Sequence, residues 1–435
     1  MGRLLLIALR NIVAQRRRSL LLGTAIGFVT FLLVVLFAFS GGLQDNMIAS
    51  ATSLASGHVN VGGFYKVSPS VARPIVLDFA KVEAVLAETP GVSFVTRRGR
   101  GGFDRLTSPK TSLMNAVSGL DVASDRQFRA RVQIVAGDLD ALRAPDTLLL
   151  FERQASELEV TIGDMVTLTG LTARGVRNRA DVRVAAIARD MGGLSQIMSF
   201  VPEVTLNAFY QLRPENTGVL MAFIEDREMS AEVAANLRER LREAGWEVMD
   251  PEAQPFWQKQ QVVEREDWTG QRLDVSTWRD EMGQIADVVE ALDAFAVVFT
   301  MILMAVIAIG LWNTLFMAVR ERTAEIGALR AIGMSRGAVR FQFVAEAGIL
   351  ALLAAGAGAG LGALVVGLVN VAEIKVTSPQ LQFVLMSDTF LLALKASRVI
   401  GAVLLIAGLT GLAALWPAHR ASRIQPGVAM SRAGR

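Results

Sequence analysis

Charged and apolar side chains recur at helical spacing between residues 321 and 336, where they could form a surface that recognises another protein. The charged groups that could bond to a partner or to one another are Glu321, Arg322, Glu325 and Arg330. An apolar ridge is predicted from Ile326, Leu329 and Ile332, and Gly333 is predicted to end the helix. A solvated loop carrying positive charge is the simpler interpretation. A short amphipathic helix, however, is also suited to docking into a cleft on a cytosolic partner.

Groups for catalysis and metal binding are scarce in the sequence. It has two histidines, His58 and His419, and no cysteine. We therefore expect no histidine-based metal cluster and no thiol chemistry. No glycine is followed by lysine, which excludes a phosphate-binding loop of the Walker A type. The sequence predicts a non-catalytic chain that binds no cofactor and no metal.

Four long stretches contain no charged residue, and each has at least the roughly 20 residues that cross the hydrocarbon core of a membrane as a helix. They cover 19–44, 294–319, 347–372 and 399–418. Buried helices of a soluble protein are the alternative for any single stretch. Four such stretches together predict four transmembrane helices, one near the start and three in the last third.

The orientation of these helices follows from the arginines in the short segments beside them. Segments 1–18, 320–345 and 419–435 are rich in arginine, so we expect them on the cytoplasmic side of the membrane, with both termini inside. Arg3, Arg10 and Arg17 share one helical face of segment 1–18, which predicts an amphipathic helix lying on the inner leaflet. Segments 45–290 and 373–397 are then periplasmic.

Small and polar residues in the predicted spans indicate where helices pack together. Small-residue pairs at close-contact spacing are Gly23 with Gly27, Gly356 with Gly360, Gly358 with Gly362, and Ala407 with Gly411. Small residues are also simply common in membrane helices. Asn313 is strongly polar and deep within a span, where it could bond across helices or mark a dimer contact. The span interiors lack ionisable groups, which argues against a secondary transporter driven by protons or sodium.

The large segment 45–290 is predicted to be an α+β domain followed by a stalk. Two strand–helix–strand patterns predict a split ferredoxin-like lobe. They cover 57–61, 78–88 and 92–96, and then 219–224, 231–244 and 246–249. A β-rich insert at about 130–212 predicts a second lobe, and 256–295 is predicted to be a largely helical stalk. The fold class is a four-helix membrane protein with a large extracytoplasmic α+β domain.

The stretch ERTAEIGALRAIGMSR resembles the cytoplasmic signature of the MacB/LolC/FtsX family of ABC transporter permeases, the mechanotransmission (type VII) kind. The start, ALRNIVAQRRRSLLLGTAIG, and the end, PAHRASRIQPGVAMSR, are similar to the corresponding segments of that family. ELEVTIGDMVTL resembles a piece of its β-rich outer lobe. The segment GGLQDNMIASATSLASGHVNV is most similar to the LolC/LolE-like branch.

The resemblance implies that a coupling helix docks on a separate ATPase subunit, which holds ATP and Mg²⁺. The residues implied for this contact are Glu321, Arg322, Glu325, Gly327, Arg330 and Gly333. It also implies a second permease copy or paralogue, membrane lipid and a periplasmic carrier or adaptor protein as partners, and no nucleic acid. Release of lipoproteins from the inner membrane is the expected function. The alternatives are a MacB-like tripartite efflux system and an FtsX-like transmitter that activates a periplasmic enzyme.

Overall fold

The computed structural model describes residues 10–68, 71–321, 323–376, 378, 381, 382, 385, 387 and 389–423. The chain divides into two compact units. The helical unit comprises the residues up to Asp45, Glu290–Ile374, and the residues from Phe390 on. The sheet unit comprises Asn46–Val289 and Lys375–Thr389. Part of the predicted loop 373–397 therefore groups with the sheet unit, whose main segment agrees closely with the predicted domain at 45–290.

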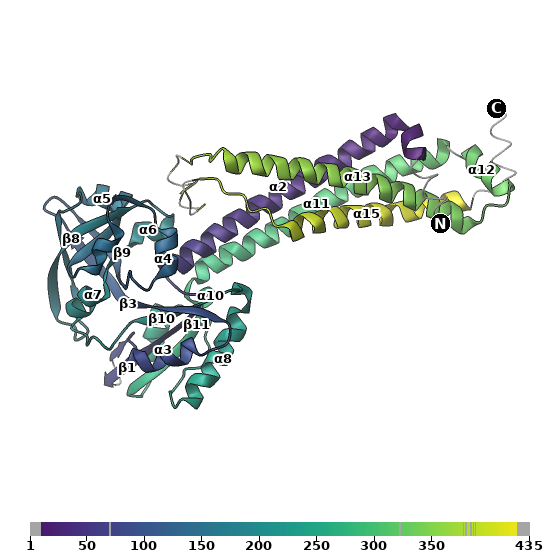
Figure 1. The fold of residues 1–435 in the computed structure, drawn as a ribbon. Coiled ribbons are helices and arrows are strands. Elements are labelled where there is room, and N and C mark those ends of the chain that lie inside the picture. Colours follow the sequence, from purple (N-terminus) through teal and green to yellow (C-terminus); the bar gives the residue numbers. More distant parts are fainter. Residues whose placement is uncertain are drawn as a thin grey trace. The chain divides into compact units, whose positions relative to one another are not determined.

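Within the part of the chain that the structure describes, four helices are long and apolar enough to cross a membrane. Figure 1 shows them as α2 (Arg16–Leu54), α11 (Gly283–Glu321), α13 (Arg336–Val371) and α15 (Ala396–Ser422). Each contains a predicted span, but α2, α11 and α13 extend well beyond theirs, because charged and polar residues flank the apolar stretches without a helix breaker. The described part of the predicted N-terminal helix 1–18 is helical at 10–14 and from Arg16; residues 1–9 lie outside the described residues.

Close packing in the helical unit centres on the contact between α2 and α13. A Cβ added at Gly358 would lie 2.8 Å from the Cα atom of Gly27 and would overlap the Gly27 carbonyl oxygen. Gly23 faces Ala354 of α13 in the same contact. Of the two overlapping pairs predicted on α13, Gly358 and Gly362 face α2. Gly356 and Gly360 are a correction: they lie on the opposite face and are exposed, and no other described part of the chain lies within 4 Å of a Cβ built on either.

The first lobe of the sheet unit has ferredoxin-like topology, as predicted. Its strands are β1 (Val59–Ser68), β3 (Val92–Thr107), β10 (Val219–Ile224) and β11 (Gly270–Thr277), in the order β11-β1-β10-β3 with every pair antiparallel. A short strand, β2 (Val71–Arg73), pairs with β1. Helices α3 (Phe79–Ala87) and α8 (Ser230–Glu243) cover the sheet. Their buried leucines and valines supply the core, as their helical spacing predicted.

The second lobe is larger than the predicted insert at 130–212. It begins with the second half of β3 and β4 (Ser112–Leu120), which the sequence analysis left out. Its further strands are β5 (Ile134–Gly137), β6 (Thr147–Phe151), β7 (Met165–Leu171), β8 (Arg177–Ala188) and β9 (Met198–Pro202). Its helices are α4 (Arg126–Arg131), α5 (Glu152–Leu158), α6 (Gly193–Ile197) and α7 (Glu203–Tyr210), with a 3-10 turn at Leu139–Arg143. Because β3 pairs with β10 in one lobe and with β4 and β7 in the other, it belongs to both.

The predicted helical stalk at 256–295 is wrong over its first half. That stretch contains α9 (Phe256–Val263), β11 and α10 (Trp278–Glu281) before α11 begins at Gly283. Val275, Ser276 and Thr277 suit a strand better than a helix, and β11 completes the first lobe beside β1. The predicted last strand, 246–249, contributes only a bridge between Val248 and Leu273.

Candidate docking site

The predicted coupling helix is present as α12 (Thr323–Ala331). It ends as predicted at Gly333, whose φ of +104° lies in the left-handed region that glycine adopts without strain. The last turn is closed by a hydrogen bond from the Gly333 amide to the Arg330 carbonyl, at 3.2 Å. Ser335 then caps α13, because its hydroxyl accepts from the Ala338 amide. A left-handed glycine followed by a cap explains the sharp turn between α12 and α13.

One side of α12 is buried against the neighbouring helices. Ile326 is 3% exposed and packs on Val339 and Phe343 of α13 and on Ala418 and Ala421 of α15. Gly327 is buried as well. These apolar contacts hold α12 against α13 and α15, so a displacement of α12 would act on both helices.

Arg330, which was predicted to contact an acidic group of an ATPase, has a partner within the chain. Its Nη1 atom donates to the carbonyl oxygen of Ser422, the last residue of α15, at 2.8 Å. The last carbonyls of a helix lack partners within the helix and carry partial negative charge, so a guanidinium is stabilising there. The structure therefore makes Arg330 a residue that holds α12 against α15.

The opposite side of α12 is open. Ala328, Ala331 and Gly333 are exposed, and Ile332 is 85% exposed. The predicted ridge of Ile326, Leu329 and Ile332 is therefore divided. Ile332 follows Ile326 by six residues, which is one and two-thirds helical turns, so the two side chains face different ways. This exposed set of Ala328, Ala331, Ile332 and Gly333 is named the docking face below.

The charged residues predicted for docking are only partly described. Glu321 is exposed at the end of α11. Arg322 lies outside the described residues, and for Glu325 and Leu329 the structure describes the backbone within α12 and not the side chain.

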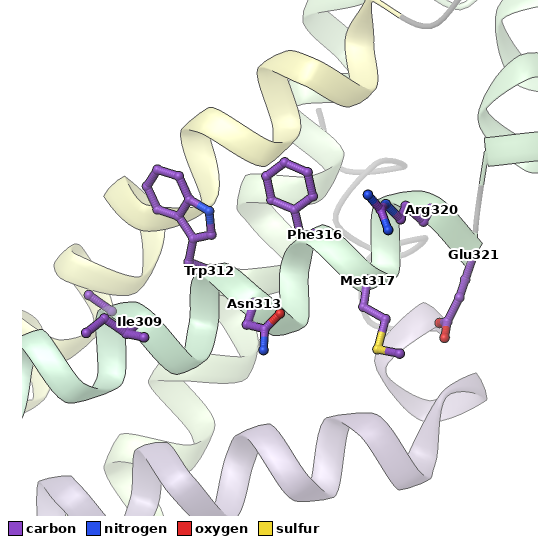
Figure 2. Close-up of a pocket in the computed structure, with 8 residues that line it drawn as sticks. Ile309, Trp312, Asn313, Phe316, Met317, Arg320 and Glu321 are labelled. Atoms are coloured by element: carbon purple, nitrogen blue, oxygen red, sulfur yellow. The ribbon is translucent and has the colours of Figure 1, made fainter.

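A cavity of about 970 Å³ lies beside the last turns of α11. It is lined by Ala308, Ile309, Trp312, Asn313, Phe316, Met317, Arg320 and Glu321. Figure 2 shows Trp312 and Phe316 pointing to one side of α11, and Asn313 and Met317 to the other. The Asn313 side chain is exposed and has no hydrogen-bond partner among the described residues.

An aromatic cluster that the sequence analysis missed joins α11 to α15. The Trp312 and Trp416 rings stack with their centroids 4.7 Å apart, and Phe316 lies 5.2 Å from Trp416. The Arg420 guanidinium lies over the Phe316 ring at 5.1 Å. The signal was available, because aromatic or cationic residues at i and i+4 occur on both helices.

Polar pairs in the sheet unit do not form a second candidate site. The Tyr210 hydroxyl donates to Asp104, and burial raises the pKa of both groups. Burial lowers the pKa of His58, whose ring Nδ1 atom bonds the backbone of Ile224. Among the described residues, no group of three or more His, Asp or Glu side chains could hold a metal ion.

Comparisons with known proteins bear on this part of the chain. Residues 297–426 match the family FtsX-like permease C-terminal. The macrolide export ATP-binding/permease protein MacB of Haemophilus ducreyi is 36% identical over 124 residues, which cover 28% of this chain and 16% of that protein. The pyoverdine export ATP-binding/permease protein PvdT of Pseudomonas fluorescens is 32% identical over 123 residues, again 28% of this chain and 16% of the relative.

A solved structure, the periplasmic region of MacB from Actinobacillus actinomycetemcomitans, aligns with a TM-score of 0.33 and 12% identity, over 55% of this chain and 94% of that one. The part of the chain that matches the curated relatives spans less than a fifth of their length. The family match and the relatives confirm the MacB/FtsX-type resemblance. The LolC/LolE-like branch stays a prediction.

Proposed function

We propose, from the premise that this chain is a permease of the MacB/FtsX type, that a separate ATPase subunit docks on the docking face of α12. One observation carries this proposal. Ile326 and Arg330 hold α12 against α13 and α15, while Ile332 stays 85% exposed beside a rigid turn. A helix that is held in place, with a large apolar side chain exposed just beyond its end, is suited to a pocket on a partner.

The same contacts suggest how force would pass from the ATPase into the membrane helices. A push on Ile332 moves α12 as a body, because Ile326 packs on both α13 and α15. The hydrogen bond between Arg330 and Ser422 carries the movement to the end of α15. On this proposal ATP and Mg²⁺ are bound by the partner, and the chain itself performs no catalysis.

We place this chain in a bacterial inner membrane, with α12 and both termini in the cytoplasm and the sheet unit in the periplasm. A second permease copy or paralogue pairs with this chain. Asn313 supports a paired arrangement, because its amide is exposed on an apolar helix and has no partner among the described residues. In hydrocarbon an amide is stabilised by bonding across a helix interface. A matching amide on the second chain would satisfy it.

The proposed substrate is a lipoprotein or another amphiphile at the outer face of the inner membrane, passed on to a periplasmic carrier. Efflux with a periplasmic adaptor is the second candidate. The relatives favour it, since MacB and PvdT are named as export proteins for macrolides and for pyoverdine. In both cases the sheet unit is the part that meets the periplasmic protein.

The test is to co-express the chain with the ABC ATPase encoded beside it and to purify both in nanodiscs. We expect a stable complex whose ATP turnover needs both subunits. Failure of an ATPase to remain bound to the wild-type chain would reject the proposal. Photo-crosslinkers placed in the sheet unit then separate the candidates, because a lipoprotein carrier and an efflux adaptor give different cross-linked partners.

A further inference from the structure

Two arginines of β3 lie at the ends of the two long helices that reach the sheet unit. Arg98 and Arg100 are separated by one glycine, so they lie on the same face of the strand. Both are nearly buried: the Arg98 side chain is 2% exposed and that of Arg100 is 9% exposed. A buried guanidinium is costly unless it is paired and hydrogen-bonded, so the partners of each arginine matter.

Arg98 holds the C-terminal end of α2. Its guanidinium donates to the carbonyl oxygens of Ser53 and Leu54, the last two residues of that helix. It also forms an ion pair with Asp125, with Nη2 2.6 Å from Oδ2. The other oxygen of Asp125 caps α4 by accepting from the Phe128 amide. The end of α2 is thereby tied to the second lobe.

The apolar surroundings of Arg98 belong to the same lobe. The guanidinium lies 5.2 Å from the centre of the Phe128 ring and 5.4 Å from that of Phe200. Leu54 is fully buried in one core cluster with both phenylalanines. The last turn of α2 is therefore part of the core of the second lobe.

Arg100 holds the beginning of α11 instead. Its Nη2 atom donates to Glu281, at 2.9 Å, and Glu281 lies two residues before α11 starts. The carboxylate of Glu281 also accepts from the Ser276 hydroxyl of β11, at 2.8 Å. The Arg100 guanidinium stacks on Phe256 at 4.0 Å. These partners come from the first lobe, so the two long helices attach to different lobes of the sheet unit.

The strand that joins the two attachments is irregular just beyond them. The pairing of β3 with β4 shifts register between Arg100 and Phe103, at Gly101 and Gly102. A bulge bends a strand, and glycine offers little resistance to backbone rotation. The Gly102 amide is held by the Tyr210 hydroxyl at 2.7 Å rather than by a ladder partner.

We propose that Arg98 and Arg100 are positioning residues that attach α2 to the second lobe and α11 to the first. A displacement of α2 relative to α11 then moves the lobes against each other about β3, the strand they share, and the glycine bulge beyond both arginines allows that strand to bend. This inference deepens the proposed function and rests on it, since the displacement originates in the ATPase.

The test measures the distance between the lobes in the full chain bound to its ATPase in nanodiscs. The chain has no cysteine, so Glu239→Cys in α8 and Arg183→Cys in β8 place one spin label on each lobe. Both positions are exposed. We expect the label distance to change between the ATP-bound and nucleotide-free states of the wild-type background. Arg98→Lys keeps the charge but cannot reach Asp125 and both carbonyls, and we expect it to shrink that change by roughly threefold or more.

The matched control is Lys66→Gln. Lys66 is also a buried cation of the sheet unit, 1% exposed, and its Nζ atom donates to the carbonyl of Val263, the last residue of the short helix α9. It caps a helix that stays within one lobe, so the nucleotide-dependent change should persist. If Arg98→Lys does not fold, Asp125→Asn replaces it, because asparagine still caps α4 but removes the ion pair.

Each outcome decides one proposal. Loss of the distance change in Arg98→Lys or Asp125→Asn, with ATPase binding and ATP turnover retained, supports the inference. An unchanged response in these variants, or a wild-type complex that turns over ATP with the lobes at constant distance, overturns it. Absence of any bound ATPase rejects the proposed function instead, before the lobes are compared.

Discussion

Two arginines of this protein bind the C-terminal carbonyls of long helices in very different surroundings. Arg98 binds the end of α2, is 1% exposed, and is neutralised by Asp125 between two phenylalanine rings. Arg330 binds the end of α15 through Ser422, is half-buried, and lies next to the exposed docking face. Both arginines donate to carbonyls at a helix end, but Arg98 is more deeply buried than Arg330.

The difference separates a permanent attachment from one that can yield. Breaking the Arg98 contact would leave an uncompensated charge in the core of a lobe, so the contact persists as long as the lobe is folded. Arg330 is half-buried, so we expect the exchange of its carbonyl for water to cost less than it would at Arg98. On the proposed function the chain needs both kinds of contact, a fixed one where force is delivered and an adaptable one where a partner docks and leaves. The Arg98 contact is called the fixed joint below, and the Arg330 contact the adaptable joint.

The largest expected effect is on the fixed joint. Arg98→Ala leaves the Asp125 carboxylate and two helix carbonyls without a cation, and we expect it to lower the free energy of unfolding by about 3–5 kcal/mol. Denaturant unfolding of the full chain in detergent, followed by circular dichroism, measures this. Arg129→Ala is the control, because its ion pair with Asp140 is exposed and contributes little to stability. Equal losses in both variants would remove the distinction between the two arginines.

The next effect concerns the docking face. Ile332→Asp places a charge where a partner pocket should receive an apolar side chain, and we expect affinity for the ATPase to fall roughly 30-fold, the size of an interface hot spot. Stability should not change, since Ile332 is 85% exposed. Leu171→Asp is the control, an exposed leucine on the sheet unit. Titration of the ATPase against each variant in nanodiscs decides the matter; wild-type affinity in Ile332→Asp would place the docking site elsewhere.

The third effect tests whether α2 is also fixed within the helical unit. Gly358→Ala forces a methyl group against the Gly27 carbonyl and should destabilise the helix contact by about 1–3 kcal/mol. Gly356→Ala two residues earlier meets nothing within 4 Å and should be neutral or stabilise the helix by up to about 1 kcal/mol. Thermal unfolding of both variants in detergent gives the comparison. A harmless Gly358→Ala would show that α2 and α13 can separate freely.

The sequence predicted these features unevenly, for physical reasons. Membrane spans and the ferredoxin-like lobe were predictable because charge-free length and apolar periodicity are local properties of the chain. The end of α12 was predictable because a glycine after the last turn is a local signal. Spacing alone, however, offered Gly356 with Gly360 and Gly358 with Gly362 as packing pairs alike. Which of two overlapping glycine pairs meets a neighbour depends on how the helix is rotated.

The roles of the arginines could not be predicted in the same way. The partners of Arg98 are 27 to 45 residues away, and Arg100 pairs across 181 residues. Nothing in the local sequence distinguishes these arginines from exposed ones such as Arg105. The contact of Arg330 with Ser422 spans 92 residues and was equally beyond local prediction.

A smaller effect is expected at the adaptable joint itself. Arg330→Gln replaces a charged donor to the Ser422 carbonyl by a shorter neutral one, and should cost about 1 kcal/mol of stability. The larger consequence should be functional, because α12 is then held to α15 by fewer contacts. ATP turnover by the bound ATPase should continue while the movement of the lobes declines. Measuring both in one nanodisc preparation tests this, and a joint loss of turnover and movement would mean that Arg330 contacts the ATPase directly.

The smallest effect belongs to arginines in full contact with water. Hydrogen bonds from Arg129 and Arg143 lower the pKa of Asp140 from 3.8 to about 2. Since the folded-state pKa is depressed, the ion pairs stabilise the fold above the unfolded-state pKa, and this contribution is lost as the pH falls from about 4 toward 2. Asp140→Asn should therefore differ from wild type in unfolding midpoint near neutral pH and converge with it in acid.

Asp125→Asn should be far more destabilising than Asp140→Asn at neutral pH, because burial rather than the mere presence of a pair sets the cost of breaking it. Denaturant midpoints of both variants across the acid range make this comparison, and similar losses at neutral pH would show that Arg98 is no more firmly held than a surface arginine.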